Sequence, residues 1–133
     1  MVRTFGDVPW YETTLDVDNR DELYKPRDKR EVVMDKILED LDFACTNCST
    51  DKTLTESSTL ITKWVALALK SRICLFEGTY RKYHTELGLQ NLAEKFLRAS
   101  IAASEELMTK GPYKLLNTEM WRHSIVLCLH RKN

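Results

Sequence analysis

The sequence predicts an all-α fold with three main helices and an irregular N-terminal lead-in. Only four Gly and three Pro occur among 133 residues, and apolar side chains recur at helical spacing in three long stretches. This length suits a single domain. Twenty basic and twenty acidic residues cancel. The chain therefore has no net charge that would attract nucleic acid.

Residues 1–29 are polar, carry turn signals and two prolines, and are expected to be extended or irregular. Asp28 and Glu31 have the spacing of a capping box, which predicts that Asp28 accepts hydrogen bonds from the first turn of a helix over Lys29 to Ala44. The expected apolar stripe of this helix consists of Val33, Ile37, Leu41 and Ala44, widened by Val32, Leu38 and Phe43.

A second helix is expected from about Thr59 to His84. It is apolar on much of its circumference, so we expect neighbours on two of its sides. Trp64 and Tyr80 are interpreted as core residues, and Gly78 as a site of close packing or a kink. The face expected to be buried consists of Ile61, Val65, Ala68, Leu69, Ile73, Phe76 and Tyr80.

A third helix is expected from about Leu89 to Thr109, ended by Gly111 and Pro112. It would form an αα-hairpin with the second helix, joined through residues 85–88. Its expected buried face consists of Leu92, Phe96, Ala99, Ala103 and Leu107. The Trp64-Val65-Ala66-Leu67 motif is typical of the first helix of a tetratricopeptide repeat, but the remainder does not keep the 34-residue register. We interpret the hairpin as a degenerate, tetratricopeptide-like repeat.

Four sequence blocks, in order and in register, resemble the SusD/RagB family of outer-membrane nutrient-binding lipoproteins. The resemblance covers about residues 2 to 117, so residues 1–118 are interpreted as a partial SusD-like helical domain. The blocks are Phe5-Gly6-Asp7-Val8-Pro9-Trp10, Leu23-Tyr24-Lys25-Pro26-Arg27, Arg30-Glu31-Val32-Val33 with Ile37-Leu38-Glu39-Asp40-Leu41-Asp42-Phe43-Ala44, and Thr62-Lys63-Trp64-Val65-Ala66-Leu67-Ala68-Leu69-Lys70-Ser71-Arg72-Ile73-Cys74-Leu75-Phe76-Glu77-Gly78-Thr79.

The resemblance implies a non-enzymatic protein that captures oligosaccharides at the outer membrane, on the cell surface, and passes them to a SusC-like TonB-dependent transporter. Intact members are several times longer, begin with a lipoprotein signal and carry a C-terminal ligand-binding region. We therefore expect this chain to be an internal fragment without a signal or lipobox, with its glycan site elsewhere. No ligand-binding residue and no cofactor is transferred to it. The alternative is a free-standing helical-repeat adaptor that binds a partner protein in a groove.

Residues 119–133 depart from the family pattern. One codon assignment for the stretch that begins Glu119-Met120-Trp121, with a single nucleotide restored, encodes Gly-Asp-Val-Ala-Ala-Phe-Tyr-Arg, which is similar to the family's continuation. The hypothesis is that these residues are an out-of-frame C-terminal tail. An intact reading frame through Asn133 that matches related protein sequence beyond it would contradict this hypothesis.

Cys45 and Cys48 have the spacing of half a zinc site or of a redox pair. A closed zinc site needs two more ligands, and no second pair has a matching spacing. We therefore expect no metal site, and a small metal-dependent helical protein is the weakest interpretation. The remaining candidate ligands are His84, His123, His130, Cys74 and Cys128.

The other candidate sites have simpler structural interpretations. Trp10, Tyr11 and Tyr24 could stack on sugar rings, but anchoring of the lead-in is preferred. The aromatic and basic run Tyr80-Arg81-Lys82-Tyr83-His84 stands at a helix end, where the dipole already favours cations, so no nucleic-acid partner is expected. The acidic cluster of Glu39, Asp40 and Asp42 is interpreted as a solvated face, and no catalytic residue is predicted.

The apolar surface of the second helix also bears on association. It exceeds what two neighbouring helices in a chain of this size can cover. The sequence therefore predicts self-association of the chain through the uncovered remainder.

Overall fold

The computed structural model describes residues 1–51 and 60–113. The tail hypothesis for residues 119–133 lies outside the described residues. The all-α prediction is confirmed, with no strand in the part of the chain that the structure describes. Its helices are α1 (Val2–Phe5), α2 (Arg20–Leu23), α3 (Arg30–Asn47), α5 (Lys63–Tyr83), η1 (Thr85–Leu87), η2 (Gln90–Leu92) and α6 (Ala93–Lys110).

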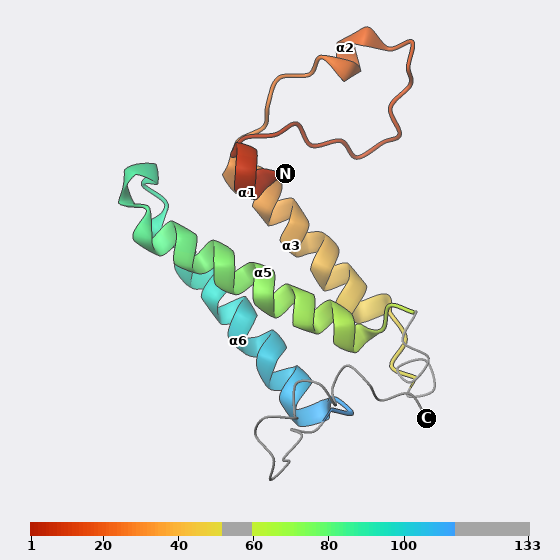
Figure 1. Ribbon diagram of the computed structural model, residues 1–133, viewed down its shortest axis with the longest axis vertical. Coiled ribbons are helices and arrows are strands. Elements are labelled where there is room, and N and C mark those ends of the chain that lie inside the picture. The colour runs from red at the N-terminus through yellow and green to blue at the C-terminus, as the bar shows by residue number, and fades with distance from the viewer. Residues whose placement is uncertain (52–59, 114–133) are drawn as a thin grey trace, which may run out of the picture.

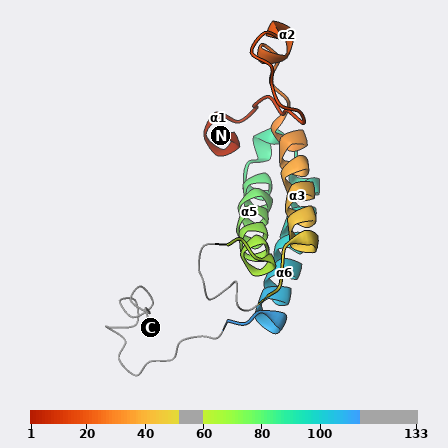
Figure 2. The same ribbon diagram turned by 90° about the vertical axis from the view of Figure 1, so that its right-hand side faces the viewer.

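Helix α5 is the central element. It packs against both α3 and α6 and runs antiparallel to each of them (Figure 1). The turn through η1 and η2 joins α5 to α6, so the expected αα-hairpin is confirmed. The lead-in forms a loop that projects beyond one end of α3, and α1 lies beside the α3–α5 pair (Figure 2). None of the described helices is long and apolar enough to cross a membrane.

Two clusters of buried side chains hold the three long helices together. One joins the middle of α5 to the first half of α3 and the start of α6, and the other lies near the start of α5. The first contains Met34, Leu38, Cys74 and Phe96, and the second contains Cys45, Trp64, Ala66, Leu67 and Ala103. The prediction of Trp64 as a core residue is confirmed, whereas Tyr80 is only half-buried.

Helices α5 and α6 approach closely at Gly78. A Cβ atom on Gly78 would lie 2.7 Å from Leu97 Cδ2 and 3.1 Å from the Leu97 backbone nitrogen. Ser100 Oγ donates a hydrogen bond to the Ser71 carbonyl oxygen over 2.9 Å, and the hydroxyls of Ser71 and Ser104 are 2.6 Å apart. Small side chains thus line the contact between α5 and α6. Gly78 marks close packing, which was one of its two sequence-based interpretations.

The predicted capping role of Asp28 is wrong. Helix α3 begins at Arg30 with Lys29 as its N-cap residue, and Lys29 makes no side-chain cap. Asp7 Oδ1 instead accepts the Arg30 backbone N–H over 2.8 Å, from a residue distant in sequence. Residues 8 and 28 form an isolated antiparallel bridge, which turns Asp28 toward the lead-in. There Asp28 Oδ2 accepts the backbone N–H of Trp10 over 2.8 Å.

The predicted buried stripe of α3 is partly wrong. Val33, Leu38 and Leu41 are buried as expected, but Val32 and Phe43 are 47% and 70% exposed. Met34 and Cys45 are buried in their place, on the side that faces α5. Several arcs of this helix carry apolar residues, and contact with α5 decides which arc is covered.

The predicted buried face of α5 is also wrong. Ile61 is 73%, Val65 45% and Leu69 48% exposed. The buried arc contains Trp64, Ala66, Leu67, Cys74, Glu77, Gly78 and Arg81. Because α5 is apolar nearly all round, periodicity alone does not indicate which arc its two neighbours cover. One apolar face of the central helix consequently points away from both of them.

Candidate functional site

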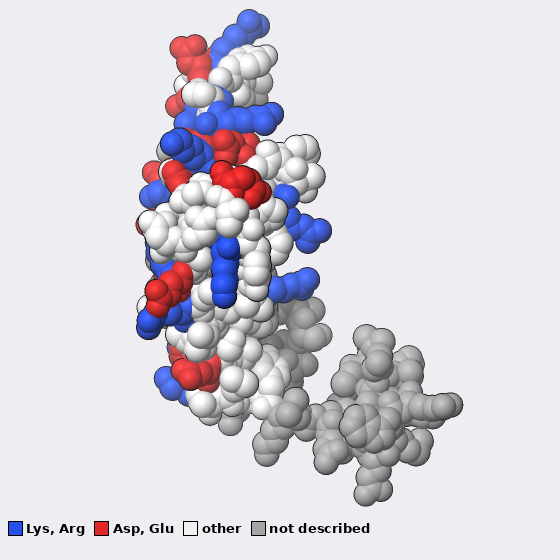
Figure 3. Space-filling view, turned by 90° about the vertical axis from the view of Figure 1, so that its left-hand side faces the viewer, with Lys and Arg blue, Asp and Glu red and all other residues white. Residues whose placement is uncertain are grey.

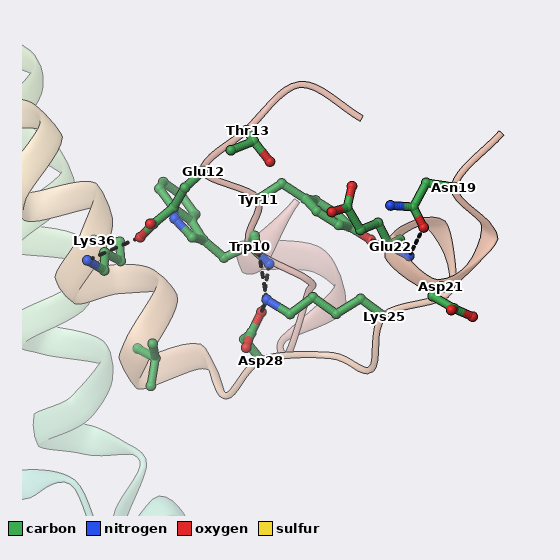
Figure 4. A pocket seen from close by; sticks show the side chains of 11 residues that line it. Trp10, Tyr11, Glu12, Thr13, Asn19, Asp21, Glu22, Lys25, Asp28 and Lys36 are labelled. Atoms are coloured by element: carbon green, nitrogen blue, oxygen red, sulfur yellow. Dashed lines mark hydrogen bonds and ion pairs between the residues drawn. The ribbon is translucent and has the colours of Figure 1, made fainter. Parts of the chain in front are cut away.

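The first candidate is a pocket formed by the lead-in loop against the start of α3 (Figure 4). Its volume is about 740 Å³. We call it the loop pocket. Aromatic rings and carboxylates from the loop line it, together with two side chains of α3. The lining residues are Trp10, Tyr11, Glu12, Thr13, Asn19, Asp21, Glu22, Lys25, Asp28, Val32 and Lys36.

Most polar groups of the loop pocket bond to one another. Lys25 Nζ donates to the Trp10 carbonyl oxygen and pairs with Asp28 Oδ2, each over 2.9 Å. Tyr11 Oη donates to the Glu22 carbonyl oxygen over 2.9 Å. The Trp10 backbone N–H, and secondly the Lys25 ammonium, lower the pKa of the Asp28 carboxyl below its ordinary value. These contacts shape the loop itself.

The three lead-in aromatics therefore differ in role. Trp10 and Tyr11 are half-buried and line the loop pocket, with backbone or hydroxyl hydrogen bonds inside the loop. Tyr24 is 83% exposed and does not line the pocket, so the anchoring interpretation is wrong for this residue. The structure brings two of the three candidate aromatics to one site.

The second candidate is a groove of about 690 Å³ between α1, α3 and α5. We call it the arginine groove. Its walls are mainly apolar, three arginines line it, and no acidic residue does. The lining residues are Met1, Val2, Arg3, Val8, Pro9, Trp10, Arg30, Val33, Met34, Ile37, Leu69, Arg72, Ile73 and Phe76.

A buried ion network lies at one end of this groove. Arg30 Nη2 is 2.5 Å from Glu77 Oε2, and Arg81 Nε is 2.8 Å from Glu77 Oε1. Glu77 is fully buried and Arg81 is 1% exposed. The Arg30 guanidinium also stacks on the Tyr80 ring at 3.9 Å, and that of Arg81 on Phe96 at 4.4 Å. Two guanidinium groups thus share one carboxylate.

Sequence reasoning missed this network, because charged residues are usually interpreted as surface residues. One signal was present, since Glu77 and Arg81 stand four positions apart on one helix. Nothing in the sequence connects either residue to Arg30. The burial of Arg81 also removes it from the surface run of aromatic and basic residues at the end of α5.

The cysteines lie in apolar surroundings. Burial raises the pKa of the Cys45 thiol, and it raises that of Cys74 to about 11. Such thiols are poor nucleophiles at neutral pH. Within residues 1–51 and 60–113, no group of three His, Cys, Asp or Glu side chains could hold a metal ion. Of the sequence-derived candidate ligands, His123, His130 and Cys128 lie outside these ranges.

The acidic cluster does not form a site. Glu39, Asp40 and Asp42 are exposed, Glu39 pairs with Lys36 over 3.3 Å, and Asp42 pairs with Lys70. At the end of α5, the rings of Tyr80 and His84 lie 4.1 Å apart, and His84 Nδ1 is 2.6 Å from Glu86 Oε1.

No family model, curated protein or solved structure matches this chain. The sequence blocks and the geometry above are therefore the basis for a functional proposal.

Proposed function

We propose that this chain is a helical part of a SusD-like glycan-binding protein of the outer membrane. In this role it scaffolds the intact protein at the cell surface and contacts a SusC-like TonB-dependent transporter during oligosaccharide uptake. The four sequence blocks support the family, and the all-α hairpin agrees with the tetratricopeptide-like fold that the resemblance implies. The observation that carries the docking role is the uncovered apolar face of α5.

This face is large for a solvent-facing side of a helix. Its most exposed apolar side chains are Val65 (45%), Leu69 (48%), Leu75 (52%) and Phe76 (40%). Arg72 is the one charged side chain on this face of α5. Contiguous apolar surface on a soluble domain usually marks a contact with another protein. A second layer of protein over α5 would remove it from water.

Apolar side chains are also exposed on the adjacent side of the α5–α6 pair. Uncharged side chains cover much of the middle of this side, with one basic side chain among them, and the other charged ones lie along both margins and over the lead-in loop (Figure 3). Ile101 and Met108 of α6 are 60% and 73% exposed. The protein therefore offers docking surface over a wide area. The buried thiols and the paired or solvated carboxylates described above favour a binding role over catalysis.

A free-standing helical adaptor is the second candidate, and the arginine groove favours it. A groove between helices of this size suits a peptide or helix of a partner protein. The two functions differ in the partner, since the adaptor needs neither a glycan nor a transporter. A SusC-like gene directly upstream in the source DNA would favour the first function, and its absence would favour the second.

The direct test is binding of the immobilised chain to a detergent-solubilised SusC-like transporter from the same source. We expect saturable binding that Leu75→Glu weakens at least about tenfold, because a charge is then buried in the contact. Phe43→Glu on α3 is the matched control for an added surface charge, since Phe43 is 70% exposed and lies outside this docking surface. Oligosaccharide titration of the chain should show no binding, because the proposed glycan site lies elsewhere. Failure to bind the transporter would reject the proposal.

A further inference from the structure

The arginine groove combines an apolar wall with unbalanced positive charge. On α5, Leu69, Ile73 and Phe76 line it at positions i, i+4 and i+7, so they share one face of the helix. From α3, Val33, Met34 and Ile37 line the opposite side. This spacing forms a channel between two antiparallel helices, of the kind into which side-chain ridges of a third helix pack.

The charges of the groove lack a counterpart. Among the described residues, neither Arg3 nor Arg72 forms an ion pair. Arg30 is paired, but it shares Glu77 with Arg81, so this network carries a surplus positive charge. No acidic side chain lines the groove. Charges across specific interfaces are complementary, so the fitting occupant is negative.

Two residues that line the groove also carry unpaired buried donors. Trp10 Nε1 and Arg30 Nε are buried and have no hydrogen-bond partner among the described residues. The Arg30 side chain as a whole is only 9% exposed. Buried donors are normally satisfied, and unsatisfied ones point to a missing acceptor. Both residues line the arginine groove, so unpaired donors lie behind its surface.

We infer that the arginine groove binds an amphipathic helix of a partner protein, whose apolar stripe is flanked by Asp or Glu side chains. This inference deepens the proposed function and rests on its docking role. The apolar stripe packs over Leu69 and Phe76, and the carboxylates pair with Arg3 and Arg72. A helix fits better than an isolated small acid, because apolar surface continues along α5 beyond the groove to Val65 and Leu75.

The test uses two synthetic peptides of about 18 residues with the same Leu stripe at i, i+3, i+4 and i+7. One carries Glu on both sides of the stripe, and the other carries Lys at the same positions. Binding of each fluorescein-labelled peptide to the whole chain is followed by fluorescence anisotropy. We expect the Glu peptide to bind at least about tenfold more tightly at low salt, with a smaller ratio near 0.5 M salt, where exposed charges are screened.

Paired variants locate the peptide. Arg72→Glu should largely abolish the preference for the Glu peptide, because the new carboxylate offsets the charge of Arg3, whereas Lys82→Glu on the same helix should leave the preference unchanged. Phe76→Ala should weaken both peptides by at least about fivefold, since it removes an apolar anchor. Phe43→Ala is the matched control, because Phe43 is 70% exposed on α3 but does not line the groove. Circular dichroism of each variant verifies that the helices are retained.

Equal binding of the two peptides, or a preference that Arg72→Glu does not alter, would overturn the inference. So would sedimentation of the chain as a dimer that Arg72→Glu dissociates while neither peptide binds, since the occupant would then be a second copy. The proposed function is tested separately. Glu-peptide binding without transporter binding rejects that function alone, and transporter binding without a Glu preference rejects the groove inference alone.

Discussion

Arg30 Nη2 lies 2.5 Å from Glu77 Oε2, although the two residues are 47 positions apart in the chain. This ion pair joins the first turn of α3 to the second half of α5, and both side chains are buried. Arg81 binds the other carboxylate oxygen of Glu77 over 2.8 Å. A single buried carboxylate therefore joins α3 to α5 electrostatically, in addition to the two apolar clusters.

Glu77→Gln should strongly destabilise the fold. The substitution keeps the shape of the side chain but leaves two buried guanidinium groups without a counter-charge, which costs about 3–5 kcal/mol. Urea unfolding followed by circular dichroism measures the change. The control is Glu94→Gln, which breaks an exposed pair with Arg98 and should cost under about 1 kcal/mol. Equal losses for the two variants would contradict the role assigned to Glu77.

Gly78→Ala should also destabilise the protein, although Ala is favoured over Gly inside a helix by about 1 kcal/mol. The new methyl group would lie 2.7 Å from Leu97 Cδ2 and 3.1 Å from the Leu97 backbone nitrogen. Overpacking of this kind costs about 1–3 kcal/mol. In a double-mutant cycle, Leu97→Ala should relieve part of the loss. A stabilised Gly78→Ala variant would show that α5 and α6 are less closely packed than the structure has them.

Asp7→Ala should destabilise the start of α3. Asp7 Oδ1 accepts the Arg30 backbone N–H, so the variant removes the side-chain acceptor at this helix end, which costs about 1 kcal/mol. Hydrogen exchange of the Arg30 amide should accelerate. Asp28→Ala should leave that amide protected and expose the Trp10 amide instead, because Asp28 accepts the Trp10 N–H. If Asp28→Ala instead accelerated exchange of the Arg30 amide and Asp7→Ala did not, Asp28 would be the capping residue.

The lead-in loop should loosen in acid. Since the folded-state pKa of Asp28 lies below its ordinary value of 3.8, its carboxylate stabilises the loop at pH values above 3.8. This contribution is lost as the pH falls through the lowered pKa. Amide exchange of Trp10 measured against pH should show the loss, corrected for the intrinsic pH dependence of exchange. Asp28→Asn should remove the acid transition, and a transition of unchanged size in that variant would assign it to another group.

The chain should self-associate at high concentration through the uncovered face of α5. Sedimentation velocity should show a weight-average mass that rises with concentration, because association removes apolar surface from water. Val65→Glu and Leu75→Glu should each reduce the rise, since both residues are about half exposed on this face. Arg98→Glu on α6 is the control for a changed surface charge. A strictly monomeric particle at every concentration would contradict the prediction.

Much of the secondary structure was predictable. The long helices begin and end within a few residues of the expected positions, and Gly111 follows the last residue of α6. Local propensity and turn chemistry determine such features. The candidate sites were less predictable. Trp10 and Tyr11 were recognised as a candidate surface from their residue type, but the arginine groove combines three separate segments, and no local pattern indicates that they meet.

The sequence by itself determined the helical class, the three long helices and the α5–α6 hairpin. These follow from interactions between residues close in the chain. For Gly78 the sequence left two interpretations, and the structure decided for close packing. Only the tertiary structure decided that Asp7 caps α3, that Glu77 is buried between two arginines and that Leu69 faces outward. The first depends on where the lead-in lies against the start of α3. The other two depend on which arc of α5 its neighbours cover, and α5 is apolar on more arcs than α3 and α6 can cover.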